Sequence, residues 1–259
     1  MRNLVFFLVI FLLSGCSYFD EKEDETKNWN ADRLYAEAKG NLDAGNYSEA
    51  VDFYQRLEAR YPFGKHAQQA LLDLAYGYFK SEQHDASISA SNRFIKLYPQ
   101  NIHVDYAYYL KGLANFNKGK ATLQRFIPDE FADESQRDPG ASFEAFQDFS
   151  ELIKRFPESQ YVEDAEQRMR HLRNNLAENE VHVANYYMRR GAFIAAANRA
   201  RFVIENYDRT PVVPEALVIM AKAYRVLEME DLANDAIRVL KLNYPNHPGI
   251  YQIEELEVK

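Results

Sequence analysis

The hydrophobic and small residues of this chain recur with a period of 37 residues, measured from pairs of an aromatic residue and a proline. Pro62 and Pro99 are 37 residues apart, and Asp208, which takes the place of proline in one pair, lies 37 residues before Pro245. The pairs are Tyr61-Pro62, Tyr98-Pro99, Phe156-Pro157, Tyr207-Asp208 and Tyr244-Pro245. A period of this length is the signature of a helical-repeat protein.

Each repeat carries small and apolar residues at fixed distances from the second member of its pair. Twelve residues before it lie Ala50, Ser87, Ala145, Ala196 and Ala233. Five residues before it lie Leu57, Phe94, Leu152, Val203 and Leu240, and eight residues after it lie Ala70, Ala107, Ala165 and Ala216. Between the pairs, Leu71, Leu74, Ala75 and Tyr78 follow the 3.6-residue period of a helix and not the two-residue period of a strand.

The pattern predicts an all-α fold, a right-handed superhelix of about five tetratricopeptide-like helix pairs. We expect the pairs near residues 31–61, 66–98, 103–156, 160–207 and 211–244, grouped as pairs one and two (29–99), pair three (100–157) and pairs four and five (158–250). A single pair cannot bury its apolar face, so neighbouring pairs must stack into a curved superhelix with a concave groove.

Two insertions interrupt the period. The third pair has 21 extra residues, expected at 118–140, where Pro128, Pro139 and Gly140 favour a loop. The fourth pair has 14 extra residues within 160–188, a stretch that contains neither proline nor glycine. Fourteen residues make about four helical turns, which keeps the apolar face in phase. We therefore expect one long helix of about 45 Å there.

The N-terminus has the features of a bacterial lipoprotein signal. Residues 4–13 are an unbroken apolar run, too short to cross about 30 Å of hydrocarbon but typical of a secretory signal core. The run ends in Leu13-Ser14-Gly15-Cys16, which resembles a lipobox, so residues 1–15 are expected to be removed and Cys16 to carry lipid. An ordinary signal peptide with a chance cysteine, or an N-terminal membrane helix, is the alternative.

The residues after the lipobox predict where the mature protein lies. Ser17, rather than aspartate, follows the cysteine, which by resemblance to known bacterial sorting favours the outer membrane. Residues 16–28 are acidic and lack an apolar pattern, so they are interpreted as a lipidated flexible tether. The folded part is then expected to face the periplasm.

Charge and motifs argue against most other functions. A net charge of −8 disfavours a nucleic-acid-binding protein. The chain has no Gly-rich phosphate loop, no His-Glu-x-x-His motif and no paired cysteines. Glu178 and His182 lie four residues apart on one predicted helix, but a lone pair of this kind is more often a solvated contact than a metal site. We predict no enzyme, no catalytic residue, no metal and no cofactor apart from the covalent lipid on Cys16.

Two stretches are candidate protein-binding sites. Residues 181–204 contain no acidic residue but four arginines, Arg189, Arg190, Arg199 and Arg201, and arginine is favoured at protein interfaces. A solvated helix face is the alternative. The string Tyr61-Pro62-Phe63-Gly64 carries a phenylalanine beyond what the repeat requires, so it is a candidate for lining the groove of the first two pairs. Simple packing between repeats is the alternative.

Taken together, the lipobox, the repeats and several strings resemble the BamD (ComL) family. The strings are Arg60-Tyr61-Pro62-Phe63-Gly64, Arg93-Phe94-Ile95, Arg137-Asp138-Pro139, Ser159-Gln160-Tyr161, and Arg190-Gly191-Ala192 through Asn198-Arg199. The resemblance implies an outer-membrane lipoprotein of the β-barrel assembly (Bam) complex. It implies docking on a periplasmic POTRA domain of BamA through the C-terminal repeats, with Arg189, Arg190, Gly191, Asn198 and Arg199 on that side.

The resemblance also implies further partners and a client site. The partners are an extended segment of BamC, with other Bam lipoproteins, and unfolded outer-membrane proteins, whose C-terminal strand would bind near Tyr61, Pro62, Phe63 and Gly64. Two other readings stay open at this point. One is a different periplasmic repeat lipoprotein that coordinates cell-envelope or peptidoglycan enzymes, and the other is an enzyme on a helical scaffold.

Overall fold

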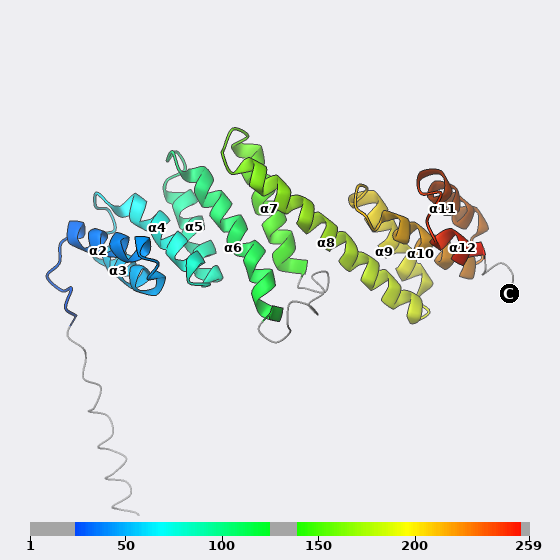
Figure 1. Cartoon of the computed structure of the whole chain (residues 1–259), viewed down its shortest axis with the longest axis horizontal. Helices are drawn as coiled ribbons and strands as arrows, with labels where there is room; N and C mark the ends of the chain where they lie inside the picture. The colour runs from blue at the N-terminus through cyan, green and yellow to red at the C-terminus, as the bar shows by residue number, and fades with distance from the viewer. Residues whose placement is uncertain (1–23, 125–138, 255–259) are drawn as a thin grey trace, which may run out of the picture.

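The computed structural model describes residues 24–124 and 139–254, and within these ranges all regular structure is helical (Figure 1). The predicted signal peptide, Cys16, residues 125–138 of the predicted loop and the tail 255–259 lie outside them. The helices are α2 (Ala31–Asp43), α3 (Tyr47–Arg60), α4 (Ala67–Lys80), α5 (His84–Leu97), α6 (Val104–Gln124), α7 (Pro139–Arg155), α8 (Val162–Arg189), α9 (Phe193–Asn206), α10 (Val213–Val226), α11 (Glu230–Asn243) and α12 (Gly249–Glu254).

The aromatic residue of each pair ends the second helix of its repeat. Tyr61, Tyr98, Tyr207 and Tyr244 are the C-caps of α3, α5, α9 and α11, with φ between −129° and −136°. Each of these N–H groups donates to the carbonyl four residues earlier at 2.8 Å. Proline follows three of them, and proline has no N–H to continue the helix. The 37-residue spacing therefore marks helix ends.

The small and apolar positions of the repeat are where the helices meet. All fourteen residues that the pattern singles out at these three positions are buried. The five small residues are completely inaccessible, as expected at a close crossing of two helices. The predicted helix pairs and the all-α, tetratricopeptide-like fold are confirmed.

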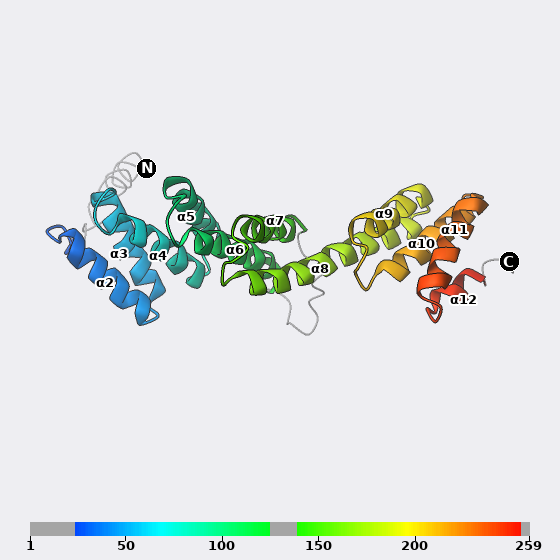
Figure 2. The same cartoon turned by 90° about the horizontal axis from the view of Figure 1, so that it is seen from above.

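The pairs stack in a row instead of closing around one centre (Figure 1). Figure 2 shows α5, α7 and α9 along one side of the row and α6, α8 and α10 along the other. Three hydrophobic clusters follow one another along the chain: the first spans α2 to α4, the second α4 to α8 and the third α8 to α12. Each pair thus buries its apolar face against the next one, as repeat proteins do.

Helix α8 contains the whole 14-residue insertion of the fourth pair. It has 28 residues, twice the length of the 14-residue helices α3, α4 and α5, which corresponds to about 42 Å. Its buried positions include Ala165 and Leu172 in the first half and Leu176, Val181 and Ala184 in the second. The predicted long helix is confirmed, and it joins the second hydrophobic cluster to the third.

Two sequence-based expectations need correction. The loop expected at 118–140 is shorter, because α6 continues through Gln124 and α7 already begins at Pro139, a first-turn position that suits proline. The tether expected at 16–28 ends before Asp24, because residues 25–28 form a turn held against α3. Beyond the last predicted pair the structure adds α12, whose Ile253 is buried in the third cluster.

Adding a methyl group should have opposite effects on the free energy of unfolding at two helical glycines. A Cβ on Gly112 of α6 would lie 2.6 Å from the ring of the fully buried Phe149, whereas one on Gly40 of α2 would meet nothing within 4 Å. We expect Gly112→Ala to lower the free energy of unfolding by about 1–3 kcal/mol through overpacking. Gly40→Ala should raise it by about 0.5–1 kcal/mol, because alanine favours the helix. Urea unfolding followed by circular dichroism measures both, and equal effects would contradict this packing.

Candidate functional site

The turn between α3 and α4 carries an apolar pocket of about 230 Å³. Its wall is formed by the ends of α3 and α5, the turn itself and the start of α4, namely Leu57, Glu58, Tyr61, Pro62, Phe63, Ala67, Ala70, Leu71, Leu97 and Tyr98. Tyr61, Pro62 and Phe63 of the predicted client site therefore line one pocket, while Gly64 closes the turn by donating its N–H to the Tyr61 carbonyl at 3.2 Å.

Phe63 separates the two interpretations of this string. Tyr61 is half-buried and its hydroxyl donates to the Trp29 carbonyl at 3.0 Å, so packing between elements accounts for it. The side chain of Phe63 is 97% exposed, and Leu97 on the opposite wall is also exposed. Packing within the chain does not explain two large apolar side chains that stand in solvent at one pocket. Two such side chains at one pocket make this turn a candidate binding site.

A second pocket, of about 360 Å³ and polar, lies on the same helix start. Gly64, Gln68, Gln69 and Asn101 line it, and the Asn101 amide donates to Gln68 Oε1 at 2.9 Å. Side-chain amides both donate and accept hydrogen bonds, as a peptide backbone requires. An apolar pocket next to a row of amides is suited to an extended polypeptide.

The turn between α8 and α9 holds the second group of predicted residues. Arg189 ends α8, Arg190 is its C-cap, and Gly191 has φ of +73°, a left-handed conformation that glycine adopts without strain. Asn198 and Arg199 lie on the exposed side of α9. The Arg190 guanidinium lies 5.9 Å from the ring centroid of Tyr186, one helical turn earlier. The structure thus places all five predicted residues on one turn and the helix that follows it.

The charge of this surface differs from the prediction at Arg199. Its Nη1 lies 2.9 Å from Glu180 Oε2 on α8, and Glu180 is the residue just before the acid-free stretch. Arg201 likewise has Glu205 at 3.8 Å. Among the residues that the structure describes, no carboxylate pairs with Arg189 or Arg190, so the free positive charge lies there, whereas the ion pair of Arg199 joins α9 to α8. Reversing the charge of Arg199 would break its ion pair with Glu180 as well as change the surface charge. A substitution at Arg199 is therefore a poor test of binding at this surface.

Sequence analysis missed the apolar part of this surface. Ile194 and Phe202 of α9 are exposed, whereas Tyr186 is exposed on the side of α8 opposite its buried residues Val181 and Ala184. Ile194, Asn198 and Phe202 are four residues apart and share one helix face, away from the buried residues Ala196 and Ala200. The sequence indicates this surface only through Ile194 and Phe202, which form a second apolar face on a helix whose other face already supplies the buried residues. Exposed aromatic and arginine side chains together are typical of the centre of a protein interface.

A buried carboxylate between α2, α3 and α4 was examined as a catalytic candidate. Asp73 Oδ2 accepts from the Tyr54 hydroxyl at 3.0 Å and the Tyr35 hydroxyl at 3.4 Å, and Oδ1 accepts from Gln69 at 2.8 Å. Burial, followed by the Asp73 charge, raises the pKa of Tyr35 to about 12 and that of Tyr54 further still. Both phenols therefore stay protonated donors. This arrangement holds three helices together and offers no activated nucleophile.

Within residues 24–124 and 139–254, no three histidine, cysteine, aspartate or glutamate side chains lie close enough to hold a metal ion. None of the helices from α2 to α12 is both long and apolar enough to cross a membrane.

Fold and surface together define a tetratricopeptide-type helical-repeat protein with exposed aromatic and arginine residues at two turns. Residues 27–240 match the family model described as YfiO, outer membrane lipoprotein. Relatives named outer membrane protein assembly factor BamD match almost the whole chain. The protein of Neisseria meningitidis serogroup B is 44% identical over 93% of this chain and 90% of its own length. The chain therefore belongs to the BamD family of outer membrane protein assembly factors.

More distant relatives and solved structures complete the comparison. The BamD proteins of Xylella fastidiosa and Vibrio cholerae are 36% and 35% identical, covering 92% and 91% of this chain and 80% and 95% of their own lengths. Among solved structures, MamA covers 88% of this chain and 93% of its own at 17% identity with a TM-score of 0.35. TTC0263, a tetratricopeptide-repeat protein of Thermus thermophilus, covers 89% and 100% at 12% identity with a TM-score of 0.37.

Proposed function

We propose that this chain is a lipid-anchored adaptor of the Bam complex that holds BamA at the α8–α9 turn and receives unfolded outer-membrane proteins at the α3–α4 turn. Membership of the BamD family supports the first part. The observation that carries the second is Phe63, which is 97% exposed at the mouth of an apolar pocket. We assign the chain no catalytic step, because scaffolding requires only surfaces that bind.

The α3–α4 pocket suits the strand of an unfolded barrel protein. Such a strand is extended, alternates apolar and polar side chains, and leaves its backbone groups unpaired until it joins a sheet. An apolar side chain of the client fits between Phe63 and Leu97, and the amides of Gln68, Gln69 and Asn101 satisfy nearby backbone groups. One pocket of about 230 Å³ admits a single large side chain, so the site holds a client by one anchor and releases it readily.

The α8–α9 surface suits a folded domain. Ile194 and Phe202 of α9 supply exposed apolar area, and Arg189 and Arg190 supply positive charge at the turn before this helix. Such surfaces derive affinity from a few aromatic and arginine anchors. We assign this surface to a periplasmic POTRA domain of BamA, and we expect BamC to contribute an extended segment elsewhere on the superhelix.

A detergent pull-down of the lipidated protein, with identification of what accompanies it, tests the proposed function. BamA is expected to be recovered in stoichiometric amount, together with other lipoproteins of the complex. Recovery of a peptidoglycan hydrolase or a division protein without BamA would contradict the proposal and favour a different envelope scaffold.

The membrane anchor has its own test. Because the thioether at Cys16 is the proposed attachment, Cys16→Ala is expected to move the protein from the membrane pellet to the soluble periplasmic fraction. Several acyl chains at about 0.8 kcal/mol per buried CH₂ make the attachment durable, and the variant has none. Fractionation after a carbonate wash measures the change. A Cys16→Ala protein that still pellets with membranes would show that another element anchors it.

A further inference from the structure

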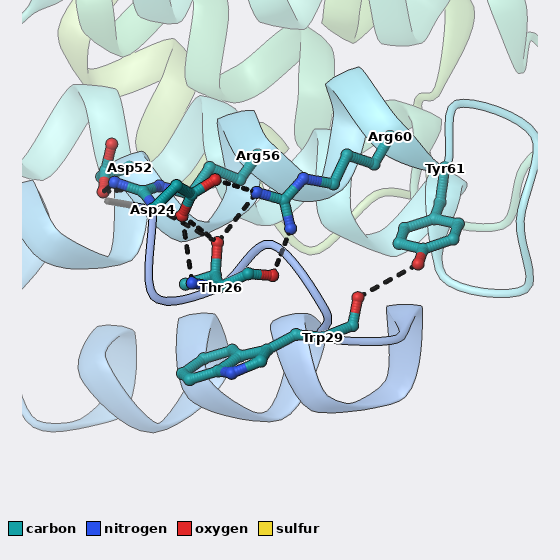
Figure 3. Close-up of polar contacts among 7 residues, drawn as sticks. All are labelled: Asp24, Thr26, Trp29, Asp52, Arg56, Arg60 and Tyr61. Atoms are coloured by element: carbon teal, nitrogen blue, oxygen red, sulfur yellow. Dashed lines mark hydrogen bonds and ion pairs between the residues drawn. The ribbon is translucent and has the colours of Figure 1, made fainter. Parts of the chain in front are cut away.

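The segment before the first helix is clipped to α3 by two arginines (Figure 3). The Asp24 carboxylate accepts from Arg56 Nη1 at 2.5 Å and from Arg60 Nη2. Arg60 also donates to the Thr26 carbonyl at 2.5 Å and to the Thr26 hydroxyl at 2.9 Å. Arg56 and Arg60 are one helical turn apart, so both guanidinium groups lie on the same face of α3. We call this set the N-terminal clip.

Thr26 and Trp29 extend the clip toward the client pocket. Thr26 is buried, and its hydroxyl donates to Asp24 Oδ1 at 2.7 Å. The Trp29 ring stacks on Phe53 of α3, with ring centroids 5.8 Å apart, and the Trp29 carbonyl accepts the Tyr61 hydroxyl. Polar and apolar contacts together hold residues 24–29 against the C-terminal half of α3 (Figure 3).

The clip contains a charged carboxylate. Hydrogen bonds from Thr26, and after them the charges of Arg60 and Arg56, lower the pKa of Asp24 below its ordinary value. Asp24 is therefore ionised at neutral pH. A carboxylate that meets two guanidinium groups forms stronger hydrogen bonds than a neutral pair would.

The clip limits how far the proposed lipid can lie from the fold. Cys16 and Asp24 are eight positions apart, and eight residue steps span at most about 28 Å when fully extended. If the chain were held only from Asn30, the N-cap of α2, the same calculation gives at most about 50 Å. The C-terminal pairs lie at the other end of the row (Figure 1), so the restriction applies to the first pair.

We infer that the N-terminal clip makes the first helix pair the membrane-proximal end of the superhelix, with the surface around Asp24 facing the lipid headgroups. This inference rests on the proposed lipidation of Cys16. Its consequence is that α3, and with it the client pocket at the end of α3, is kept within a fixed reach of the bilayer. The α8–α9 surface stays at the distal end, where a periplasmic domain can approach it.

Energy transfer from α3 to the bilayer tests the inference. Ala59 of α3 is exposed, so Ala59→Cys can carry a donor fluorophore once Cys16 is lipidated, with acceptors on the headgroups of uncharged phosphatidylcholine vesicles. We expect efficient transfer in the otherwise native protein. Arg56→Gln with Arg60→Gln, and separately Asp24→Ala, should each lower the transfer at least twofold. Asp24→Ala leaves every helix residue unchanged, so it remains informative if the double variant unfolds.

Two controls make the outcome decisive. Arg93→Gln removes an exposed arginine that pairs with Glu58 from α5, and it should leave the transfer unchanged. Six Gly-Ser residues inserted between residues 17 and 23 should lower the transfer even with the clip intact. If the insertion lowers it but Asp24→Ala does not, the clip inference is overturned and the anchor stands. If the native protein does not float with the vesicles, the proposed anchor fails, and the inference fails with it.

Discussion

Phe63→Ala is expected to weaken the binding of an extended client peptide by about thirtyfold, since a central aromatic anchor contributes about 2 kcal/mol. The peptide to use has the sequence of the C-terminal strand of an outer-membrane barrel protein. Because the Phe63 side chain is 97% exposed, its loss should change the free energy of unfolding by less than about 0.5 kcal/mol. Fluorescence anisotropy of a labelled peptide measures the binding, and urea unfolding measures the stability.

Ile102 provides the matched control for Phe63. It lies on the turn after Tyr98, which corresponds to the turn after Tyr61, and it is 85% exposed. It does not line the pocket between α3, α4 and α5. Ile102→Ala should therefore leave the peptide affinity unchanged. Equal losses from both substitutions would mean that general surface hydrophobicity, and not this pocket, binds the peptide.

Reversing the charge at the α8–α9 turn, Arg189→Glu with Arg190→Glu, is expected to weaken association with BamA by about a hundredfold or more, because two attractive contacts become repulsive. The helix should persist: the C-cap bonds of Arg190 are made by its backbone N–H, and acidic side chains at a helix C-terminus cost only about 0.3–1 kcal/mol each. Titration with the purified periplasmic domain of BamA measures the affinity, and circular dichroism checks helicity.

Arg209→Glu is the control for this surface. Arg209 is an exposed arginine on the following turn, beside Asp208, so this substitution makes half the change of charge of the double variant outside the proposed interface. It should reduce the affinity for BamA by no more than about twofold, through long-range charge alone. A loss as large as that of the double variant would show that net charge matters and the position does not.

The fold followed from the sequence because its determinants repeat. Small residues at helix crossings, apolar residues two turns further and aromatic helix ends recur at the same spacing, and each copy supports the others. The 14-residue insertion was interpretable for the same reason, since a whole number of turns leaves Leu172 and Leu176 on the buried face. The ends of α6 and α7 were not predicted, because Pro139 can either break a helix or begin one.

The surface contacts were less predictable because the residues that they join do not occupy repeated positions of the 37-residue pattern. Arg199 meets Glu180 across the α8–α9 crossing, 19 residues away, whereas a count along the chain found an acid-free stretch. Asp24 meets Arg60 from a segment outside the repeats, where an acidic composition indicates a flexible tether. The aromatic turn was accessible to sequence analysis, since Phe63 exceeds the repeat pattern, but its exposure depends on where α5 ends.

The proposed function requires one scaffold with two separate binding surfaces, one for clients and one for BamA. Both affinities should therefore be measured for both variants. We expect Phe63→Ala to lose the client peptide but keep BamA, and Arg189→Glu with Arg190→Glu to lose BamA but keep the peptide. If either variant loses both partners while its helicity and unfolding midpoint stay native, the two surfaces are not separate and the proposed function is wrong.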